Sequence, residues 1–294
     1  MEFLSKSSFW APDYLVESAW HEHAPFAFWL TEMHRPSTFV ELGTHHGFSY
    51  CCFCQAIERL GLETKAFAVD TWTGDDHAGL YGEEVFKRLS EYHNRYNAFS
   101  RLVRSSFDEA LSHFPDASID LLHIDGRHFY EDVKHDFASW TRKLSSRAIV
   151  LFHDTNVRER GFGVFQFWQE ISSNYRAFEF LHGHGLGVLA FGPHQRPELN
   201  AFFDAVVDPQ RALEVRTTYS CLGAAVAREW QLTQARNRIT AQSAQLAEVQ
   251  GNITALEKRI ADKDQQITIS RQQLRRLKAR SPPWKRKSQI RINK

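Results

Sequence analysis

The chain has 294 residues, of which 43% are hydrophobic and 13% aromatic, enough apolar material for one sizeable core. Its net charge of +1 conceals an asymmetry, because residues 228–294 hold 16 of the 36 basic and 5 of the 35 acidic residues, which leaves 20 basic and 30 acidic ones in residues 1–227. The acidic body argues against a nucleic-acid partner, whose phosphates it would repel. The basic end indicates contact with an anionic surface.

The sequence carries no sign of a membrane span or of export. No stretch approaches the roughly 20 apolar residues of a membrane span, and the first residues, MEFLSKSSFW, lack the apolar run of a signal peptide. Three of the four cysteines form the run CCFC, which is typical of small buried residues in a reducing compartment rather than of a zinc site. We therefore expect a cytoplasmic protein.

Strands and helices alternate along most of the chain. Aromatic residues crowd residues 1–37, which we expect to form a helical cap over a core or a pocket. The expected strands are 38–42, 65–70, 100–105, 118–125, 147–154, 177–181 and 186–192, and the expected helices between them are 48–62, 82–96, 107–114, 130–144 and 164–175. This order predicts an α/β fold, a doubly wound, mostly parallel, seven-stranded sheet over residues 38–192. The tight turn HGHG before the last strand predicts one antiparallel strand at the edge.

The pattern changes after residue 192. Residues 193–230 are expected to be a helical connector. From Leu232 apolar residues recur every seven positions, with a mixed second position three residues later, which predicts a coiled coil over residues 231–280 and a homo-oligomer. A long helix folded back on its own domain is the alternative. The basic tail, residues 281–294, is expected to contact a membrane surface, with a solvated end as the alternative.

The ends of the first three strands indicate a nucleoside site. Gly43 lets the backbone turn sharply after the first strand and Gly47 opens the next helix, without the third glycine of a dinucleotide-binding loop. Asp70 ends the second strand, where a carboxylate can accept both hydroxyls of a ribose. Ser106 and Phe107 end the third strand, where they are placed to bound an adenine ring. Ordinary strand-end turns would produce the same residues.

The ends of the next two strands carry carboxylates. Asp125 and Asp154 end neighbouring strands, so we expect them to converge and, with Thr155 or Asn156 as a third ligand, to bind Mg²⁺ or another divalent cation. His128 is the candidate general base, since the ordinary pKa of histidine, about 6.5, suits proton transfer. His153 is expected to point to the opposite side of its strand.

Four motifs, ELGTHHG, AVDTWTGD, IDGRHFYEDVKHDFASW and IVLFHDT, resemble those of the class I S-adenosylmethionine-dependent methyltransferases. The resemblance covers residues 38–192 and is nearest to a bacterial branch found beside polysaccharide and glycosyltransferase genes. It implies that Glu41, Gly43, Gly47 and Asp70 hold S-adenosylmethionine. In the similar catechol-type enzymes an Asp-Asn pair of metal ligands stands where this chain has Asp154 followed by threonine.

We therefore expect methyl transfer from S-adenosylmethionine to a hydroxyl of a glycan or small-molecule acceptor, with Asp125 and His128 as catalytic residues and the inner membrane face as the location. Asp75 and His77, in the loop after the second strand, are expected to touch the acceptor. Two alternatives stay open. One is a non-catalytic nucleoside-binding scaffold that oligomerises, and the other is a hydrolase that binds metal through histidine and aspartate.

Overall fold

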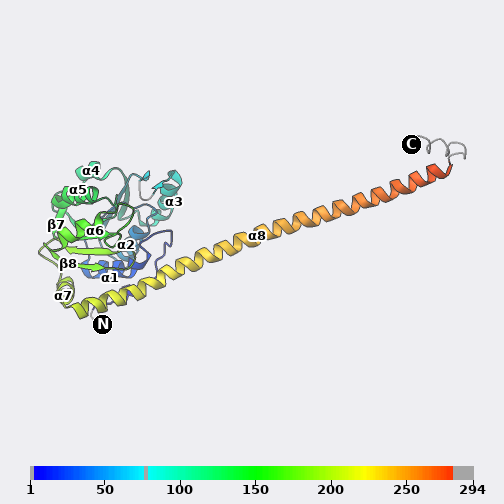
Figure 1. The fold of residues 1–294 in the computed structure, drawn as a ribbon. Helices are drawn as coiled ribbons and strands as arrows, with labels where there is room; N and C mark the ends of the chain where they lie inside the picture. Colours follow the sequence, from blue (N-terminus) through cyan, green and yellow to red (C-terminus); the bar gives the residue numbers. More distant parts are fainter. Residues whose placement is uncertain (1–2, 76–78, 281–294) are drawn as a thin grey trace. The chain divides into compact units, whose positions relative to one another are not determined.

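The computed structural model describes residues 3–75 and 79–280 (Figure 1). The chain divides into two compact units, Met1–Gln231 and Leu232–Lys294. Among the helices of the described ranges, none combines the length and the apolar character that a membrane span requires. The expected membrane contact of residues 281–294 lies outside the described residues.

A seven-stranded sheet forms the centre of the first unit. In spatial order its strands are β5 (Ser100–Arg104), β2 (Lys65–Asp70), β1 (Thr38–Leu42), β6 (Ile119–Ile124), β7 (Leu144–His153), β9 (Leu186–Ala190) and β8 (Arg176–Phe180). All neighbours are parallel except β9, which runs antiparallel to both β7 and β8. The seven-stranded, mostly parallel sheet is thus confirmed, with the antiparallel strand one place in from the edge.

Helices cover both faces of this sheet. One face carries α1 (Ala24–His34), α2 (Phe48–Arg59), α3 (Glu83–His93) and α7 (Pro197–Ala205), and the other carries α4 (Phe107–Ala110), α5 (Tyr130–Trp140) and α6 (Val164–Ser172). Short 3₁₀ turns lie at Ser7–Phe9 (η1), His21–His23 (η2), Asn94–Tyr96 (η3), Leu111–His113 (η4) and Thr141–Lys143 (η5). Helices on both faces are what a doubly wound fold requires.

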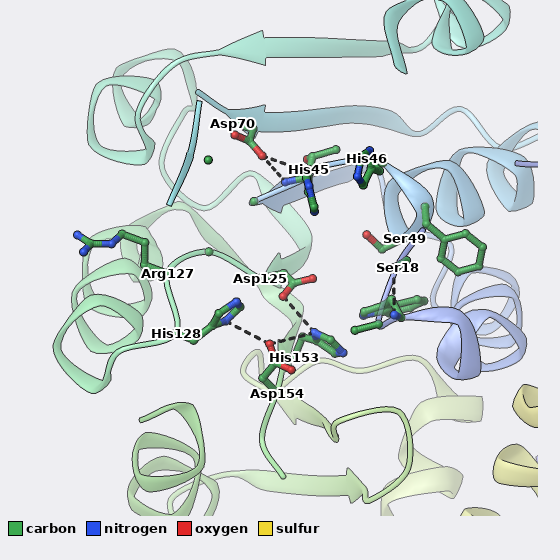
Figure 2. Close-up of a pocket in the computed structure, with 18 of the residues that line it drawn as sticks. Ser18, His45, His46, Ser49, Asp70, Asp125, Arg127, His128, His153 and Asp154 are labelled. Atoms are coloured by element: carbon green, nitrogen blue, oxygen red, sulfur yellow. Dashed lines mark hydrogen bonds and ion pairs between the residues drawn. The ribbon is translucent and has the colours of Figure 1, made fainter. Parts of the chain in front are cut away.

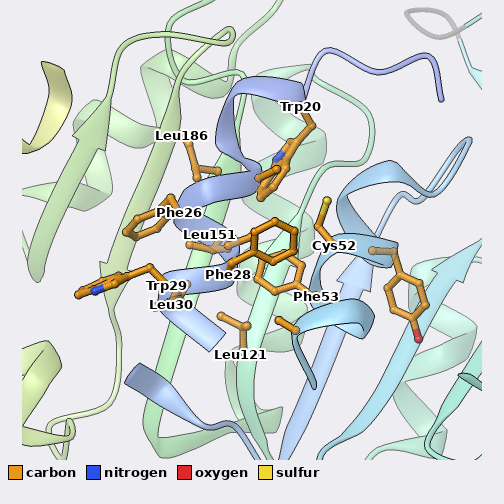
Figure 3. Packing of buried hydrophobic residues seen from close by; sticks show 14 of the residues in the cluster. Trp20, Phe26, Phe28, Trp29, Leu30, Cys52, Phe53, Leu121, Leu151 and Leu186 are labelled. Carbon is orange, nitrogen blue, oxygen red and sulfur yellow. The ribbon is translucent and has the colours of Figure 1, made fainter. Parts of the chain in front are cut away.

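Side chains of each strand alternate between the two faces, as the pleat requires. Phe39 of β1 belongs to the core under α1 and α2, whereas Val40 belongs to the core under α4, α5 and α6. Figure 3 shows the first core, in which aromatic side chains of α1 and α2 pack on Leu121 of β6 and Leu151 of β7. The CCFC run of α2 is buried there, as predicted, and burial raises the pKa of its thiols.

The N-terminal residues pack against the start of the longest helix, α8 (Pro209–Arg280). The buried Tyr219 donates a hydrogen bond of 2.8 Å to the carbonyl of Phe3, and its ring lies edge-on to Phe26 at 5.4 Å. A Cβ at Gly223 would lie 2.1 Å from the carbonyl oxygen of Glu22, so the helix and the N-terminal segment touch backbone to backbone. The cap is held between the sheet and α8.

Two features differ from the sequence prediction. The loop after β2 contains a small antiparallel hairpin of β3 (Gly74–Asp75) and β4 (Gly79–Leu80). The predicted connector, residues 193–230, contains α7 and the beginning of α8, which continues without a break to Arg280. The division into domains with separate roles at the predicted boundaries stays a prediction.

The second unit, within the described residues, is a single uninterrupted helix, the remainder of α8. At 1.5 Å per residue its 49 residues from 232 to 280 extend roughly 70 Å. The seven strong heptad residues are all exposed, from 43% for Ile253 to 70% for Leu246. The long helix is therefore confirmed, and its pairing with another helix stays a prediction.

Candidate functional site

A cavity of about 410 Å³ lies at the carboxyl ends of the parallel strands (Figure 2). Its walls come from the cap, from the loops after β1, β2 and β5, and from the loops after β6, β7 and β8. The strand order reverses at β1 and β6, and open α/β sheets bind ligands beyond such a reversal. Its volume is that of a small-molecule site.

The two glycines after β1 are required by close packing. Gly43 has φ of +86°, and a Cβ there would lie 2.1 Å from the carbonyl oxygen of Asp125. Gly47 has φ of +82°, and a Cβ would lie 2.4 Å from a methyl carbon of Leu89. Both glycines line the cavity, so the loop brings its backbone to the cavity wall, and its contact with a ligand stays a prediction.

Asp70 fastens that loop to the end of β2. Its Oδ2 accepts hydrogen bonds from the backbone N–H groups of Thr44 at 2.8 Å and His45 at 2.9 Å. Its Oδ1 accepts one from the N–H of Trp72 at 2.7 Å. Three of the four lone pairs are thus engaged, which leaves one acceptor position on Oδ1. Asp70 lines the cavity, and its contact with both hydroxyls of a ribose stays a prediction.

Glu41 does not reach the cavity, contrary to the prediction. It is completely buried, and its Oε2 lies 2.8 Å from Nδ1 of His123. Burial raises the pKa of Glu41, and the hydrogen bond with His123 opposes that rise. The ring of His123 meets that of Trp20 edge-on at 5.4 Å, and Trp20 lines the cavity. Glu41 therefore supports the wall from behind.

Ser106 and Phe107 both line the cavity, as predicted. Ser106 is the N-cap of α4, and its hydroxyl accepts from the N–H of Glu109 at 3.3 Å and donates to the carboxylate of the same residue at 2.9 Å. The Phe107 ring lies against Gly126, where a Cβ would be 2.5 Å from it. Phe107 is therefore the flat apolar wall, while the serine hydroxyl is engaged in the capping box.

The carboxylates of Asp125 and Asp154 converge at the ends of β6 and β7, as predicted, and His153 joins them (Figure 2). Nδ1 of His153 lies 3.1 Å from Oδ1 of Asp125 and 3.4 Å from Oδ2 of Asp154. The expectation that His153 points away from the site is wrong. Asp154 has φ of +61°, so the regular alternation ends at this residue and its side chain turns back toward His153.

These three groups shift one another's pKa values. Burial alone would raise the pKa of Asp125 and of Asp154, but His153 outweighs it and lowers both. Burial would likewise lower the pKa of His153, but the two carboxylates raise it well above its ordinary value. The site therefore favours an imidazolium between two carboxylates.

His128 stands beside this cluster. Its Nδ1 lies 3.2 Å from Oδ2 of Asp154, and its ring stacks on Phe162 at 4.6 Å with the planes 7° apart. Potential ligand atoms of Asp125, His128 and Asp154 lie within 4.8 Å of one another. Thr155 is completely buried and does not line the cavity, so the structure does not place it beside these candidate ligands as the sequence predicted.

The HGHG turn contributes contacts that sequence reasoning missed, since it was interpreted only as a connector. Nδ1 of His184 lies 3.2 Å from Oδ1 of Asp154. The carbonyl of Gly183 lies 2.9 Å from Nε2 of His23 and 3.1 Å from Nε2 of His153. The sequence did contain a signal for these contacts. The turn carries two histidines, and an aspartate ends another strand of the same predicted sheet.

The remaining predictions concern the loop after β2. Asp75 belongs to β3, but its side chain and the whole of His77 lie outside what the structure describes. Their contact with an acceptor stays a prediction. The cavity is also lined by residues that the sequence did not single out: Glu17, Ser18, His45, His46, Tyr81, Arg127 and Arg160.

Comparison with known proteins finds one matching family model. It is described as "Methyltransferase domain" and matches residues 40–155. A protein of Sinorhizobium fredii named "Uncharacterized protein y4gI" is 50% identical over 208 residues, which are 71% of this chain and 22% of that protein. The chain thus spans about a fifth of that relative's length.

Solved methyltransferase structures are also similar. The O-methyltransferase TomG of Streptomyces achromogenes, in complex with SAM, is 13% identical, with a TM-score of 0.44 over 62% of this chain and 83% of its own. The SAH-bound methyltransferase PaMTH1 of Podospora anserina is 11% identical, with a TM-score of 0.44 over 57% and 76%. A methyltransferase of Geobacter sulfurreducens is 16% identical, with a TM-score of 0.42 over 60% and 79%. At these scores nothing about the reaction of this chain follows from them.

Proposed function

We propose that this chain is an S-adenosylmethionine-dependent O-methyltransferase. One observation carries the proposal. Nδ1 of His128 lies 3.2 Å from Oδ2 of Asp154, and His128 lines the same cavity as the glycine loop and Asp70. A base and a nucleoside-type site thus share one edge of a methyltransferase sheet. The match of residues 40–155 to a methyltransferase domain supports the same reaction class.

The residues at the ends of β1, β2 and β5 offer groups that suit S-adenosylmethionine. The loop around Gly43 and Gly47 approaches closely because neither position has room for a Cβ. Asp70 keeps one lone pair of Oδ1 for a ribose hydroxyl, and Phe107 offers a flat surface for an adenine ring. When bound, S-adenosylmethionine supplies the methyl group as an electrophile.

The chain's own contribution is alignment and proton removal. Nδ1 of His128 lies 3.2 Å from Oδ2 of Asp154, so the other ring nitrogen, Nε2, is the atom proposed to take the proton of the acceptor hydroxyl. Stacking on Phe162 fixes the plane of the ring. His128 would take the proton of the hydroxyl as its oxygen accepts the methyl group that S-adenosylmethionine would supply, and the electron pair of the broken carbon–sulfur bond would stay on sulfur.

Divalent-metal assistance is the finer part of this proposal. Two carboxylates and a nearby imidazole suit Mg²⁺ or a similar cation. Asp125 and Asp154 would hold the ion, which would supply positive charge that lowers the pKa of the acceptor hydroxyl. His153 competes for the same two carboxylates, so the site has two ways to neutralise them.

We propose a sugar hydroxyl as the acceptor, on a glycan or a small molecule. The lining of the cavity includes carboxylate, hydroxyl and guanidinium groups from Glu17, Ser18, Arg127 and Arg160. Such groups can bind the hydroxyl groups of a sugar.

We further propose that the chain forms a homo-oligomer through residues 232–280 and meets the inner membrane face through residues 281–294. The exposed heptad residues support the first part, and the basic composition of the tail supports the second. Co-sedimentation of the full chain with vesicles of anionic lipid tests the membrane part. Unchanged binding by a chain that ends at residue 280 would contradict it.

Calorimetric titration of S-adenosylmethionine into the full chain, with Mg²⁺ and with EDTA, tests the function. We expect micromolar binding, weakened about tenfold in Phe107→Ala because the wall is lost. Phe9→Ala, at a 64% exposed residue outside the cavity, is the matched control and should bind as the wild type does. Absence of binding would contradict the proposal and favour the non-catalytic scaffold.

Formation of S-adenosylhomocysteine with a panel of monosaccharides and nucleotide sugars then tests the acceptor. Turnover on any of them supports a sugar hydroxyl, and turnover only on catechols would overturn it. A rate that EDTA abolishes and Mg²⁺ restores supports the metal-assisted form of the proposal.

A further inference from the structure

We infer that residues 232–280 pair with a second copy of this chain as a parallel, in-register, two-stranded coiled coil. This rests on the self-association in the proposed function and adds its orientation, register and strand number. The starting observation is a stripe of apolar side chains along one side of an uninterrupted helix, all of them exposed. At position a of the heptad lie Leu232, Ile239, Leu246, Ile253, Ile260, Ile267 and Leu274.

Position d of the heptad carries both apolar and polar residues. Its members are Ala235, Gln242, Val249, Leu256, Lys263, Ser270 and Leu277. In a parallel, in-register pair each residue meets its own copy, so the three polar residues are confined to layers of their own and the other eleven layers are apolar. Within residues 232–280, each of the eleven apolar layers therefore contains apolar residues from both helices.

An antiparallel pair would spread those polar residues through the seam. In the antiparallel register that overlaps all seven heptads, Lys263 faces Leu246, Ser270 faces Ile239 and Gln242 faces Ile267. Each contact occurs twice by symmetry. A hydroxyl and an amide against isoleucine are then buried without partners, which costs free energy, and Lys263 takes the place of an apolar partner for Leu246.

The charges beside the seam also discriminate between the two orientations. In the parallel register Arg259 at position g faces Asp264 at position e of the second copy, twice by symmetry. Among the other g–e pairs of residues 232–280, none places like charges together. In the antiparallel register Glu257 faces its own copy and Arg236 faces Lys278, so like charges repel.

Residue types favour two strands. Isoleucine fills four of the seven a positions, and the apolar d positions include leucine, a combination that favours dimers. In a dimer Lys263 can extend its ammonium from the d position to water, whereas a third strand would enclose it.

Cysteine cross-linking of the full chain distinguishes the two orientations. All variants carry Cys221→Ser, because Cys221 is exposed, whereas the other three cysteines are buried. Two cysteines form a disulfide only where their Cα atoms come within about 7 Å. Val249→Cys and Ile260→Cys are each expressed alone, and then together with different affinity tags, before mild oxidation and electrophoresis without reductant.

The parallel register predicts covalent dimers of each variant alone and no cross-link between the two differently tagged chains. The antiparallel register predicts no covalent dimer of either variant alone and a cross-link between the two differently tagged chains, because residue 249 then faces residue 260. Cross-links only in the mixed sample would overturn the inference.

Light scattering of the wild-type chain measures the strand number independently. A dimer has twice the mass of the 34.1 kDa chain, and a trimer would overturn the two-stranded part. A monomer that still binds S-adenosylmethionine would overturn the pairing and leave the proposed reaction standing. A dimer that does not bind S-adenosylmethionine would overturn the proposed reaction and leave the pairing standing.

Discussion

Nδ1 of His153 lies 3.1 Å from Oδ1 of Asp125 and thereby joins the end of β7 to the end of β6. The same nitrogen lies 3.4 Å from Oδ2 of Asp154, so one imidazole stands between two carboxylates. All three side chains are buried or nearly so. An internal cation thus occupies the place where a divalent ion would neutralise the same carboxylates, and removal of His153 should make the protein depend on that ion.

His153→Gln should lower the free energy of unfolding in EDTA by about 3–5 kcal/mol, because two buried carboxylates lose their charged partner. Added Mg²⁺ should restore part of that loss, whereas the wild type should respond less. Urea unfolding of both proteins in EDTA and in Mg²⁺ measures the difference.

His184→Gln is the matched control for this prediction. His184 also lies 3.2 Å from Asp154, but its side chain is 58% exposed, so its loss should change the free energy of unfolding by less than about 1 kcal/mol. Equal stability of His153→Gln and the wild type in EDTA would show that His153 is not the neutralising group.

Gly43→Ala should destabilise the protein by several kcal/mol and abolish cofactor binding. Its Cβ would lie 2.1 Å from the backbone oxygen of Asp125, and φ is +86°, so neither a rotamer change nor a small shift relieves the contact. Gly61→Ala provides the comparison, because φ is also positive, at +59°, but nothing lies within 4 Å. That change should cost only the backbone strain, about 1 kcal/mol. Thermal unfolding measures both, and equal losses would contradict the steric argument.

The sheet and its helices could be predicted because local patterns determine them. Short apolar strands alternate with amphipathic helices, and this order permits few topologies. The expectation that Asp125 and Asp154 meet follows from the same rule, since neighbouring parallel strands end at the same edge. Gly43 and Gly47 could be singled out because each follows or opens an element where the backbone must turn.

The errors arose where one residue departs from regular geometry or where distant segments meet. His153 was misplaced because the positive φ of Asp154 breaks the alternation, and nothing in the sequence marks a non-glycine residue for that conformation. Thr155 was expected to bind a cation together with Asp154, but it is completely buried and does not line the cavity. The contributions of Trp20 and His184 depend on contacts between the cap, the HGHG turn and the sheet, which no local pattern encodes.

His128→Gln should reduce the turnover number by about 10²–10⁴-fold while the affinity for S-adenosylmethionine stays unchanged. Glutamine keeps a hydrogen bond toward Asp154 but cannot take a proton at the position of Nε2. The S-adenosylhomocysteine assay measures turnover, and calorimetry measures the affinity. His135→Gln, on the exposed surface of α5, should retain full activity. Undiminished turnover in His128→Gln would remove the proposed base.

Asp136→Asn should stabilise the protein more at high pH than at low pH. Burial raises the pKa of Asp136 to about 7, whereas in the unfolded chain it keeps its ordinary value. The folded protein therefore retains the proton as the unfolded chain loses it. Stability is highest below the unfolded pKa and declines as the pH rises to 7, and the asparagine avoids this decline. The advantage should be roughly 2–3 kcal/mol larger at pH 8 than at pH 5.

Urea unfolding at the two pH values measures this difference. Glu131→Gln, at an exposed position on the same helix, should show no such dependence. An advantage of Asp136→Asn that is equal at both pH values would mean that Asp136 ionises in the folded protein as it does in the unfolded chain.

Lys263→Leu should strengthen the inferred helix pair. Lys263 occupies position d, so the leucine would complete an apolar layer between Ile260 and Ile267 of both copies and add about 1 kcal/mol for each strand. Lys258→Leu, at position f on the opposite side of the helix, makes the same chemical change without reaching the seam. Dilution of the full chain, followed by light scattering, gives the dissociation constant of each dimer. It should fall for Lys263→Leu and stay unchanged for Lys258→Leu, and equal effects of the two changes would place Lys263 outside the interface.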